Sequence, residues 1–349
     1  MGHPYRIREI AEQAGLSLAT VDRVLNGRPG VRPSTVAEVH QAIADLDRQR
    51  SQLRLAGRTF LVDLVMQAPQ RFSSAVRRAL EAELPALRPA VVRSRFHLGE
   101  EGDPGVVVRT LETIGRRGSH GVLLKAPDRP AVAEAVTRLV DRGIPVVTMF
   151  TDVPLSRRLA YVGIDNRAAG ATAAYLLTQW CPDGATVLVT VSSSVFRGEE
   201  EREMGFRAAM RQMAPSRAIR EVTETQGLDA AMLQAVSAVL AEDPTIDSVY
   251  SVGGGNAATV QAFDRAERRL AVLIAHDLDV DNTRLLRQHR ISAVLHHDLA
   301  ADMRIACRIV MQAHGALPGR LSTVPSQIQV VTPYNEPSGF GVDRVTDQE

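Results

Sequence analysis

Short apolar runs alternate with amphipathic stretches along most of this chain, from residue 59 onward. The runs "FLVDLVMQ" (60–67), "GVLLKAP" (121–127) and "IPVVTMFTD" (144–152) predict buried strands, and each precedes a stretch with helical periodicity. Such alternation predicts parallel sheets covered by helices on both faces. It resumes beyond residue 160 and gives more units than one sheet comfortably holds. We therefore predict two doubly wound parallel-sheet α/β lobes with a cleft between them, where ligands bind at the carboxyl ends of strands.

The first 46 residues show a different pattern, which is typical of a small all-α domain. Apolar residues recur at helical spacing in three short segments within residues 5–46, so we predict three helices around a small core. Gly15 and Gly27 suit helix ends, Ser17 suits the N-cap of the second helix, and Pro33 suits the first turn of the third. The segment 47–58 then carries four arginines and little apolar periodicity. We predict a small helical domain at 1–46, a connecting segment at 47–58 and a ligand-binding domain at 59–349.

Composition argues for a globular protein without a membrane span. Hydrophobic residues make up 45% of the 349 residues, and no apolar run approaches the roughly 18 residues that a span needs. The sequence starts "MGHPYRIREIAEQ", with charges where a signal peptide would need its apolar core, so we expect a cytoplasmic protein. Cys181 and Cys307 are the only cysteines and suggest neither a disulfide framework nor a metal site. The net charge is only +1, but residues 1–58 hold nine Arg against six acidic residues, which favours local contact with a polyanion.

The spacing of Ala11, Gly15 and Val21 is that of a helix-turn-helix, in which the outer face of the second helix enters the major groove. Arg23 is suited to a bidentate contact with guanine, and Leu18 and Ala19 to thymine methyl groups. Side chains suited to phosphate contacts are Ser17, Thr20, Asn26 and Arg28. Asp22 could repel phosphate or accept from a cytosine amine. Another kind of three-helix bundle could share the bare spacing.

The denser pattern "IREIAEQAGLSLATVDRVLNGRPGVRPSTVAEVHQAIADL" resembles the headpiece of the LacI/GalR family of bacterial transcriptional regulators. The resemblance implies that "LRLAG" (53–57) is a hinge helix whose Leu55 wedges into the minor groove, although Leu55 could instead be a linker residue without a task. So short a helix should order only on DNA, paired with that of a second subunit. In place of the family's usual entry to the hinge, this chain has "LDRQRSQ", which makes the segment about two residues shorter.

Residues 59 to about 340 resemble the family's effector domain, which is similar to periplasmic sugar-binding proteins of type I. The resemblance implies one lobe at 59–161 and 298–322 and another at 162–297 and 323–345. It places a ligand-clamping arginine at Arg202 in "EREMGFRAAM" and a hydroxyl acceptor at Asp277 in "LIAHDLD". A surface arginine and a loop cap are the alternatives for these two. Further candidates at strand ends and in loops are Phe72, Lys125, Phe150, Phe196 and His297.

The stretch "SVGGGNAAT" (251–259) joins a predicted strand to a helix and leaves backbone N–H groups exposed. It lacks the Lys-Ser/Thr of a phosphate-binding loop and the Gly-x-Gly-x-x-Gly pattern. We expect ligand hydroxyls or a small anion near this loop, with Asn256 as its polar group. Adjacent His296 and His297 point to opposite faces of a strand, so we predict no metal site, and we predict no cofactor.

These features favour a homodimeric or tetrameric repressor that binds double-stranded operator DNA and a small effector, which is a sugar, polyol or sugar acid. Coupling of about 1 to 3 kcal/mol between the two sites would change DNA affinity some 5- to 150-fold, in either direction. A solute-binding protein of a transport system is one alternative, and an export signal in the sequence would distinguish it from a regulator. A sugar-active enzyme with an accessory DNA-binding domain is the other, but we find no nucleophile with an evident base, so we predict no enzyme activity.

Overall fold

The computed structural model describes residues 4–100, 103–181, 184–319 and 324–337; the predicted lobe ends at 320–322 and 338–345 lie outside them. The headpiece consists of α1 (Ile7–Ala14), α2 (Leu18–Leu25) and the first half of α3 (Pro33–Leu55). As predicted, Gly15 ends α1 in a left-handed conformation (φ 66°), and the Ser17 side chain caps α2 by accepting from the Thr20 amide. The small core is formed by Ile10, Ala11, Val21, Val39 and Ala42.

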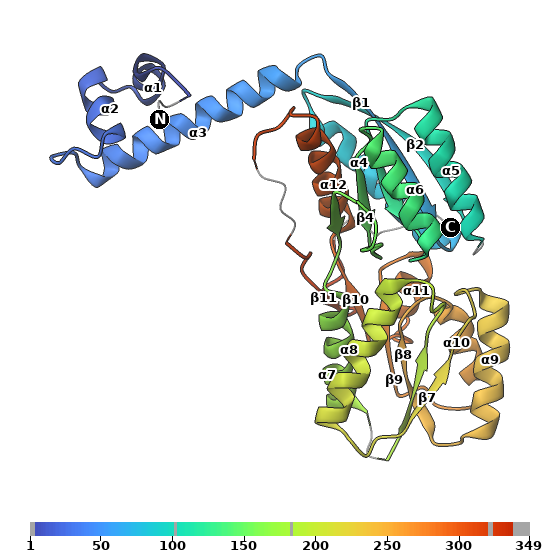
Figure 1. Ribbon diagram of the computed structural model, residues 1–349. Coiled ribbons are helices and arrows are strands. Elements are labelled where there is room, and N and C mark those ends of the chain that lie inside the picture. Colours follow the sequence, from blue (N-terminus) through green and yellow to red (C-terminus); the bar gives the residue numbers. More distant parts are fainter. Residues whose placement is uncertain (1–3, 101–102, 182–183, 320–323, 338–349) are drawn as a thin grey trace, which may run out of the picture.

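The helix α3 is longer than the sequence pattern predicted. It continues through residues 47–55 without a break, where we expected an irregular segment and a separate hinge helix that orders only on DNA. The reason is local: no Gly or Pro interrupts this stretch before Gly57, which adopts φ 75°. Figure 1 shows α3 as the single helical connection between the headpiece and the lobes. Leu55 at its end is only 6% exposed and packs in the core of the first lobe.

The first lobe is a five-stranded parallel sheet of order β2-β1-β3-β4-β5, with helices on both faces. Its elements are β1 (Thr59–Gln67), α4 (Gln70–Glu83), the 3₁₀ turn η1 (Leu84–Leu87), β2 (Val91–Gly99), α5 (Pro104–Arg117), β3 (Gly121–Lys125), α6 (Pro130–Asp141), β4 (Val146–Met149) and β5 (Ala160–Val162). Side chains of β1 alternate between two cores: Leu64 and Met66 pack with α4 and α12 (Leu299–Ala313), whereas Val65 packs with α5 and α6.

The second lobe is a six-stranded sheet of order β11-β10-β9-β8-β6-β7. Its elements are α7 (Asn166–Trp180), β6 (Thr186–Thr190), α8 (Arg197–Met213), β7 (Ile219–Val222), α9 (Asp229–Glu242), β8 (Ile246–Ser251), α10 (Asn256–Arg265), β9 (Val272–His276), α11 (Val280–Arg287), β10 (Ala293–His296) and β11 (Gln329–Val331). The predicted fold class of two parallel-sheet lobes is confirmed. The edge strand β11 differs because it runs antiparallel to β10.

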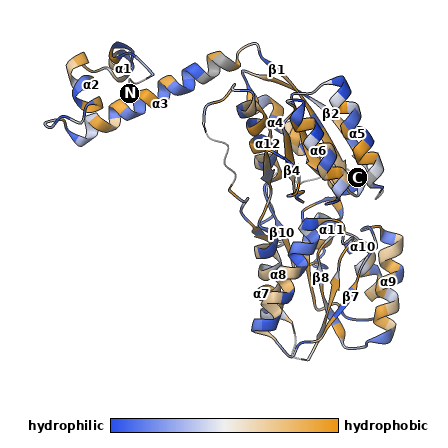
Figure 2. Ribbon diagram, viewed as in Figure 1, coloured by the Kyte–Doolittle hydropathy of each residue, from blue (hydrophilic) through white to orange (hydrophobic). Residues whose placement is uncertain are grey.

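The two lobes are joined by chain crossings after β5, after β10 and between α12 and β11. The first and last of these crossings lie side by side, because the Ser326 amide donates to the Gly163 carbonyl at 2.9 Å and Ile164 pairs with Ser326. Figure 2 shows both hydrophilic and hydrophobic residues on the outer helices, as expected for helices that pack one face against a sheet. In the part of the chain that the structure describes, no helix combines the length and apolarity needed to cross a membrane.

Candidate functional site

A cavity of about 80 Å³ lies between the two lobes, at the carboxyl ends of their strands. Six of the eight predicted ligand residues line it: Phe72, Lys125, Phe150, Phe196, Arg202 and Asp277. Seven further polar residues that the sequence patterns did not single out also line it, namely Arg71, Thr151, Ser192, Glu199, His276, Asp279 and Asn282. Glu199 could have been found, because it lies one helical turn before Arg202 on α8 and therefore on the same face.

Two lining residues hold backbone conformations that L-amino acids rarely adopt. Phe150, directly after β4, has φ 66°, and Asp277, directly after β9, has φ 61°. Such conformations cost on the order of 1–3 kcal/mol and persist when the surroundings enforce them, commonly at ligand sites. At both positions the turn follows immediately after a buried strand and places the side chain at the cavity.

Arg202 reaches the cavity because α7 and α8 cross at two glycines. A Cβ atom on Gly170 would lie 1.9 Å from the carbonyl oxygen of Arg202, and one on Gly205 would lie 2.1 Å from that of Arg167. The adjacent Phe206 is fully buried and stacks on Tyr250 with 4.6 Å between ring centroids. The stretch from Arg202 to Phe206 (the pattern Arg-x-x-Gly-Phe) thus contains both the arginine at the cavity and the glycine and phenylalanine whose packing positions it.

The guanidinium of Arg202 is held by neutral acceptors on two sides. Its Nε donates to the Asn166 side-chain oxygen at 2.8 Å, and Nη1 donates to the Val252 carbonyl at 3.2 Å. Its Nη2 lies 3.7 Å from the Asp277 carboxylate, longer than the roughly 2.7–2.9 Å of a charge-assisted hydrogen bond. The pair can therefore offer both a donor and an acceptor to a ligand with neighbouring hydroxyl groups.

His297 does not line the cavity but supports Asp277 from behind. Its Nε2 lies 3.3 Å from the Asp277 carboxylate, and its Nδ1 lies 2.5 Å from that of Asp302 on α12. Burial alone would lower the pKa of His297, but hydrogen bonds to the two carboxylates outweigh burial and raise it to about 9. For Asp277, burial acts to raise the pKa, but Arg202 and His297 hold it well below its usual range. Asp277 is therefore an ionised acceptor.

Lys125, the only lysine of the chain, lies among aromatic rings in the cavity. Its Nζ donates to the Gln67 carbonyl at 3.0 Å and lies 4.0 Å from the centroid of the Phe196 ring. Burial lowers the pKa of Lys125 to about 8. Phe72 and Phe150 pack edge to face at 5.3 Å and form an apolar wall. An apolar wall beside a few donors and acceptors suits a sugar-like ligand.

Asn256 lies behind the cavity rather than on its lining. Its side-chain amide donates to Asn282 at 2.8 Å, and Asn282 in turn donates to the carbonyls of His276 and Asp277. The predicted polar group of the glycine loop therefore contacts the lining residue Asn282, which in turn holds the turn at the end of β9. Direct ligand contact by Asn256 or His297 would need a rearrangement of these buried side chains.

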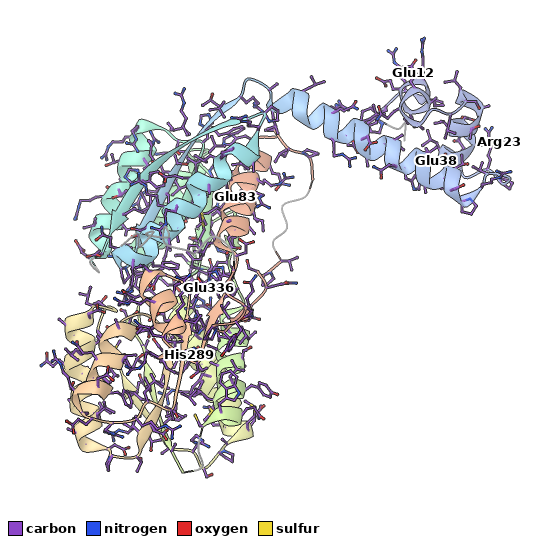
Figure 3. The ribbon with its side chains drawn as sticks, turned by 180° about the vertical axis from the view of Figure 1, so that it is seen from behind. Glu12, Arg23, Glu38, Glu83, His289 and Glu336 are labelled. Carbon is purple, nitrogen blue, oxygen red and sulfur yellow. The ribbon has the colours of Figure 1, made fainter. Side chains whose placement is uncertain are left out.

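The outer face of α2 in the headpiece is exposed. Leu18 is 55% exposed, Ala19 and Arg23 are also exposed, and Figure 3 shows Arg23 on the headpiece, away from the lobes. Asp22 has partners within the protein: it lies 3.0 Å from the Arg28 guanidinium and accepts from the Asn26 amide at 2.8 Å. Asp22 thus holds both Arg28 and Asn26 beside α2.

Comparison with known families matches both parts of the chain. Residues 6–50 match "Bacterial regulatory proteins, lacI family", and residues 64–316 match "Periplasmic binding protein domain". The chain belongs to the periplasmic binding protein domain family and carries a lacI-family domain at its N-terminus. The resemblance found in the sequence is confirmed.

Individual relatives agree with this assignment. The chain is 30% identical to the HTH-type transcriptional regulator reg1 of Streptomyces lividans over 172 residues, 47% of each chain. It is 28% identical to the HTH-type transcriptional regulator AglR of Rhizobium meliloti over 183 residues, 50% of each chain. These matches span about half the length of the curated relatives.

Solved structures share the fold of the two lobes. The glucose-galactose binding protein GanP of Geobacillus stearothermophilus superposes with a TM-score of 0.71 at 20% identity, covering 80% of this chain and 99% of GanP. A putative LacI transcriptional regulator of Bacteroides fragilis superposes with a TM-score of 0.70 at 16% identity, covering 80% of this chain and 98% of that one.

Proposed function

We propose that this protein is a DNA-binding transcriptional regulator whose affinity for operator DNA depends on a small metabolite bound between its lobes. The observation that carries the proposal is the joining, in one chain, of an exposed helix-turn-helix face to a polar cavity between two lobes. The names of the matched relatives, which are transcriptional regulators, support it. We assign direct base contacts to Leu18, Ala19 and Arg23, and phosphate contacts to Ser17, Thr20, Asn26 and Arg28.

We propose a sugar, polyol or sugar acid of about one ring as the effector. Asp277 would accept hydrogen bonds from hydroxyl groups, Arg202 and Lys125 would donate, and Phe72 and Phe150 would cover the apolar face of a ring. The sugar-binding names of proteins similar in fold support this class of ligand. Lys125 would distinguish a sugar acid from a neutral sugar.

We also propose that the active form is a homodimer, because helix-turn-helix proteins read two half-sites of a double-stranded operator. Leu55 is buried in the first lobe, so insertion into a minor groove would require that it leave this core. We propose the same division into headpiece, hinge segment and two-lobed domain. The change is that α3 continues without a break across residue 46, the predicted end of the headpiece.

The test separates the two sites. DNA duplexes are first selected for binding to the full-length protein, and a thermal-shift panel of sugars, polyols and sugar acids identifies effectors. Arg23→Ala should weaken binding to the selected duplex by about 1–3 kcal/mol, roughly 5- to 150-fold, at fixed salt concentration. It should leave effector-induced thermal stabilisation unchanged.

Arg109→Ala serves as the matched control, because Arg109 is an exposed arginine of the first lobe and its loss changes net charge equally. The proposal fails if the wild-type protein shows no preference among duplexes at any salt concentration, or if Arg23→Ala abolishes both responses.

A further inference from the structure

The glycine loop at residues 253–255 is occupied by side chains of the protein itself. A Cβ atom on Gly253 would lie 2.6 Å from the Ser192 hydroxyl oxygen, and one on Gly254 would lie 2.1 Å from Nη2 of Arg71. Ser192 belongs to the same lobe as the loop, but Arg71 is in the first turn of α4 in the other lobe. The absence of a side chain at Gly254 therefore makes room for an arginine that crosses between the lobes.

Arg71 makes its polar contacts with the second lobe. Its Nη2 donates to the Gly227 carbonyl at 2.8 Å, and its Nε lies 3.2 Å from the Asp279 carboxylate. Asp279 is fixed in place as the N-cap of α11, because it accepts from the Asn282 amide at 2.7 Å. A third contact, from Nη1 to Asp229, is longer at 3.9 Å.

The position of this arginine connects it to the ligand cavity. Arg71 lines the cavity, yet 17% of its side chain is exposed, whereas the side chain of Asp279 is only 7% exposed. The guanidinium thus lies between the cavity and solvent. A hydrogen bond from a charged donor, such as that from Arg71 to the Gly227 carbonyl, is stronger than one between neutral groups, and the planar guanidinium can satisfy several acceptors at once.

We propose that Arg71 is a positioning residue that holds the two lobes closed over the ligand, and that Gly227, Gly254 and Asp279 form its seat. This inference rests on the proposed function for its purpose, since Arg71 lines the cavity proposed for the ligand and contacts the second lobe beside it. Closure of two lobes about a hinge is a common response to ligands in two-lobed folds. Here the Arg71 side chain of the first lobe reaches three loops of the second lobe, which precede α9, α10 and α11.

The experiment measures the distance between the lobes directly, in the full-length protein without DNA or ligand. Nitroxide labels are attached at Ala131→Cys on α6 and Ala238→Cys on α9, which replace two exposed alanines, one in each lobe. The native cysteines are buried and should remain unlabelled. Double electron–electron resonance then gives the distribution of distances between the lobes.

Two variants test in different ways whether Arg71 holds the lobes closed, and each has a matched control. Arg71→Ala removes the guanidinium, and Gly254→Ala fills its seat without changing Arg71; Gly254 has no positive φ, so its backbone tolerates alanine. The controls are Arg78→Ala, an exposed arginine of the same helix, and Gly99→Ala, where a Cβ atom meets nothing within 4 Å.

We expect a narrow distribution for the wild-type pair and both controls, and a shift to longer distances in both test variants. Other contacts between the lobes, such as the Gly198 amide to the Thr151 hydroxyl at 3.0 Å, remain in all variants. If Arg71→Ala keeps the wild-type distribution, or if the wild-type protein already shows the longer distances, Arg71 does not hold the lobes closed. Because the readout needs neither DNA nor effector, its failure is distinguishable from failure of the proposed function.

Discussion

The pairing of Arg202 with Asp277 gives a quantitative prediction about the cavity. Arg202→Met keeps much of the side-chain volume but removes the guanidinium from a site that is 6% exposed. The substitution leaves Asn166 and Val252 without the donor that each now has. Within the described residues, it also leaves His297 as the remaining ion-pair partner of Asp277.

The expected cost follows from burial and distance. Removing one partner of a buried ion pair costs about 3–5 kcal/mol, and we expect the lower end because His297 still faces Asp277 at 3.3 Å. Asp277→Asn removes the opposite charge while keeping the shape of the side chain. Because the two groups interact across 3.7 Å in a partly desolvated cavity, the double variant should be less destabilised than the sum by about 2 kcal/mol.

The assay uses the single tryptophan of the chain. Trp180 ends α7, and α7 packs closely against α8, which carries Arg202, so its fluorescence reports unfolding of the second lobe. Urea titrations of the wild-type protein, both single variants and the double variant give the four free energies of unfolding that the cycle needs.

Additivity would refute the reasoning. If the two single effects sum to that of the double variant within about 0.5 kcal/mol, the 3.7 Å contact carries no coupling, and Arg202 is held by its neutral acceptors alone. A coupling near 2 kcal/mol with normal unfolding slopes would support a charge pair that is available to a ligand.

Two further predictions concern the supports of the cavity. Gly170→Ala should separate α7 from α8 and lower stability by about 1–3 kcal/mol, measured by the same fluorescence, whereas Gly99→Ala should change little. The protonated form of His297 is favoured in the folded protein (pKa about 9, against an ordinary 6.5), so its contribution is complete below about pH 6.5 and disappears as pH rises through 9. His297→Gln should therefore lower the melting temperature most near pH 6 and least near pH 9, and a constant difference across this range in calorimetry would contradict the assigned pair.

The sequence predicted the parallel strands well because buried strands in such sheets are continuous apolar runs, as in β1 and β3. The two edge strands of the second lobe were missed for the opposite reason. The strand β7 reads "IREV", with two exposed charges, and β11 has three residues. Both lie at sheet edges, where one side faces solvent and the apolar signal is weak.

The cavity was predictable where a residue lies in a recognisable local pattern. Arg202 belongs to the Arg-x-x-Gly-Phe element, and Asp277 follows a buried strand. Arg71 could not be found in this way, because its partners lie 156 and 208 positions further along the chain, at Gly227 and Asp279. His297 was placed at a strand end and Asn256 in the loop between a strand and a helix, but only side-chain geometry shows that each contacts the lining from behind.

A continuous set of contacts joins the cavity to the helix that carries the headpiece. Asp277 contacts His297, His297 contacts Asp302, and Asp302 lies on the buried face of α12. The next residues on that face share a core cluster with Leu55, the last residue of α3. A ligand can shift a conformational equilibrium only through different affinities for the two states. Because Leu55 and α12 belong to the same core, a state that moves α12 would disturb the core in which the end of α3 packs. The helix that carries the headpiece and the support of Asp277 therefore share one buried core.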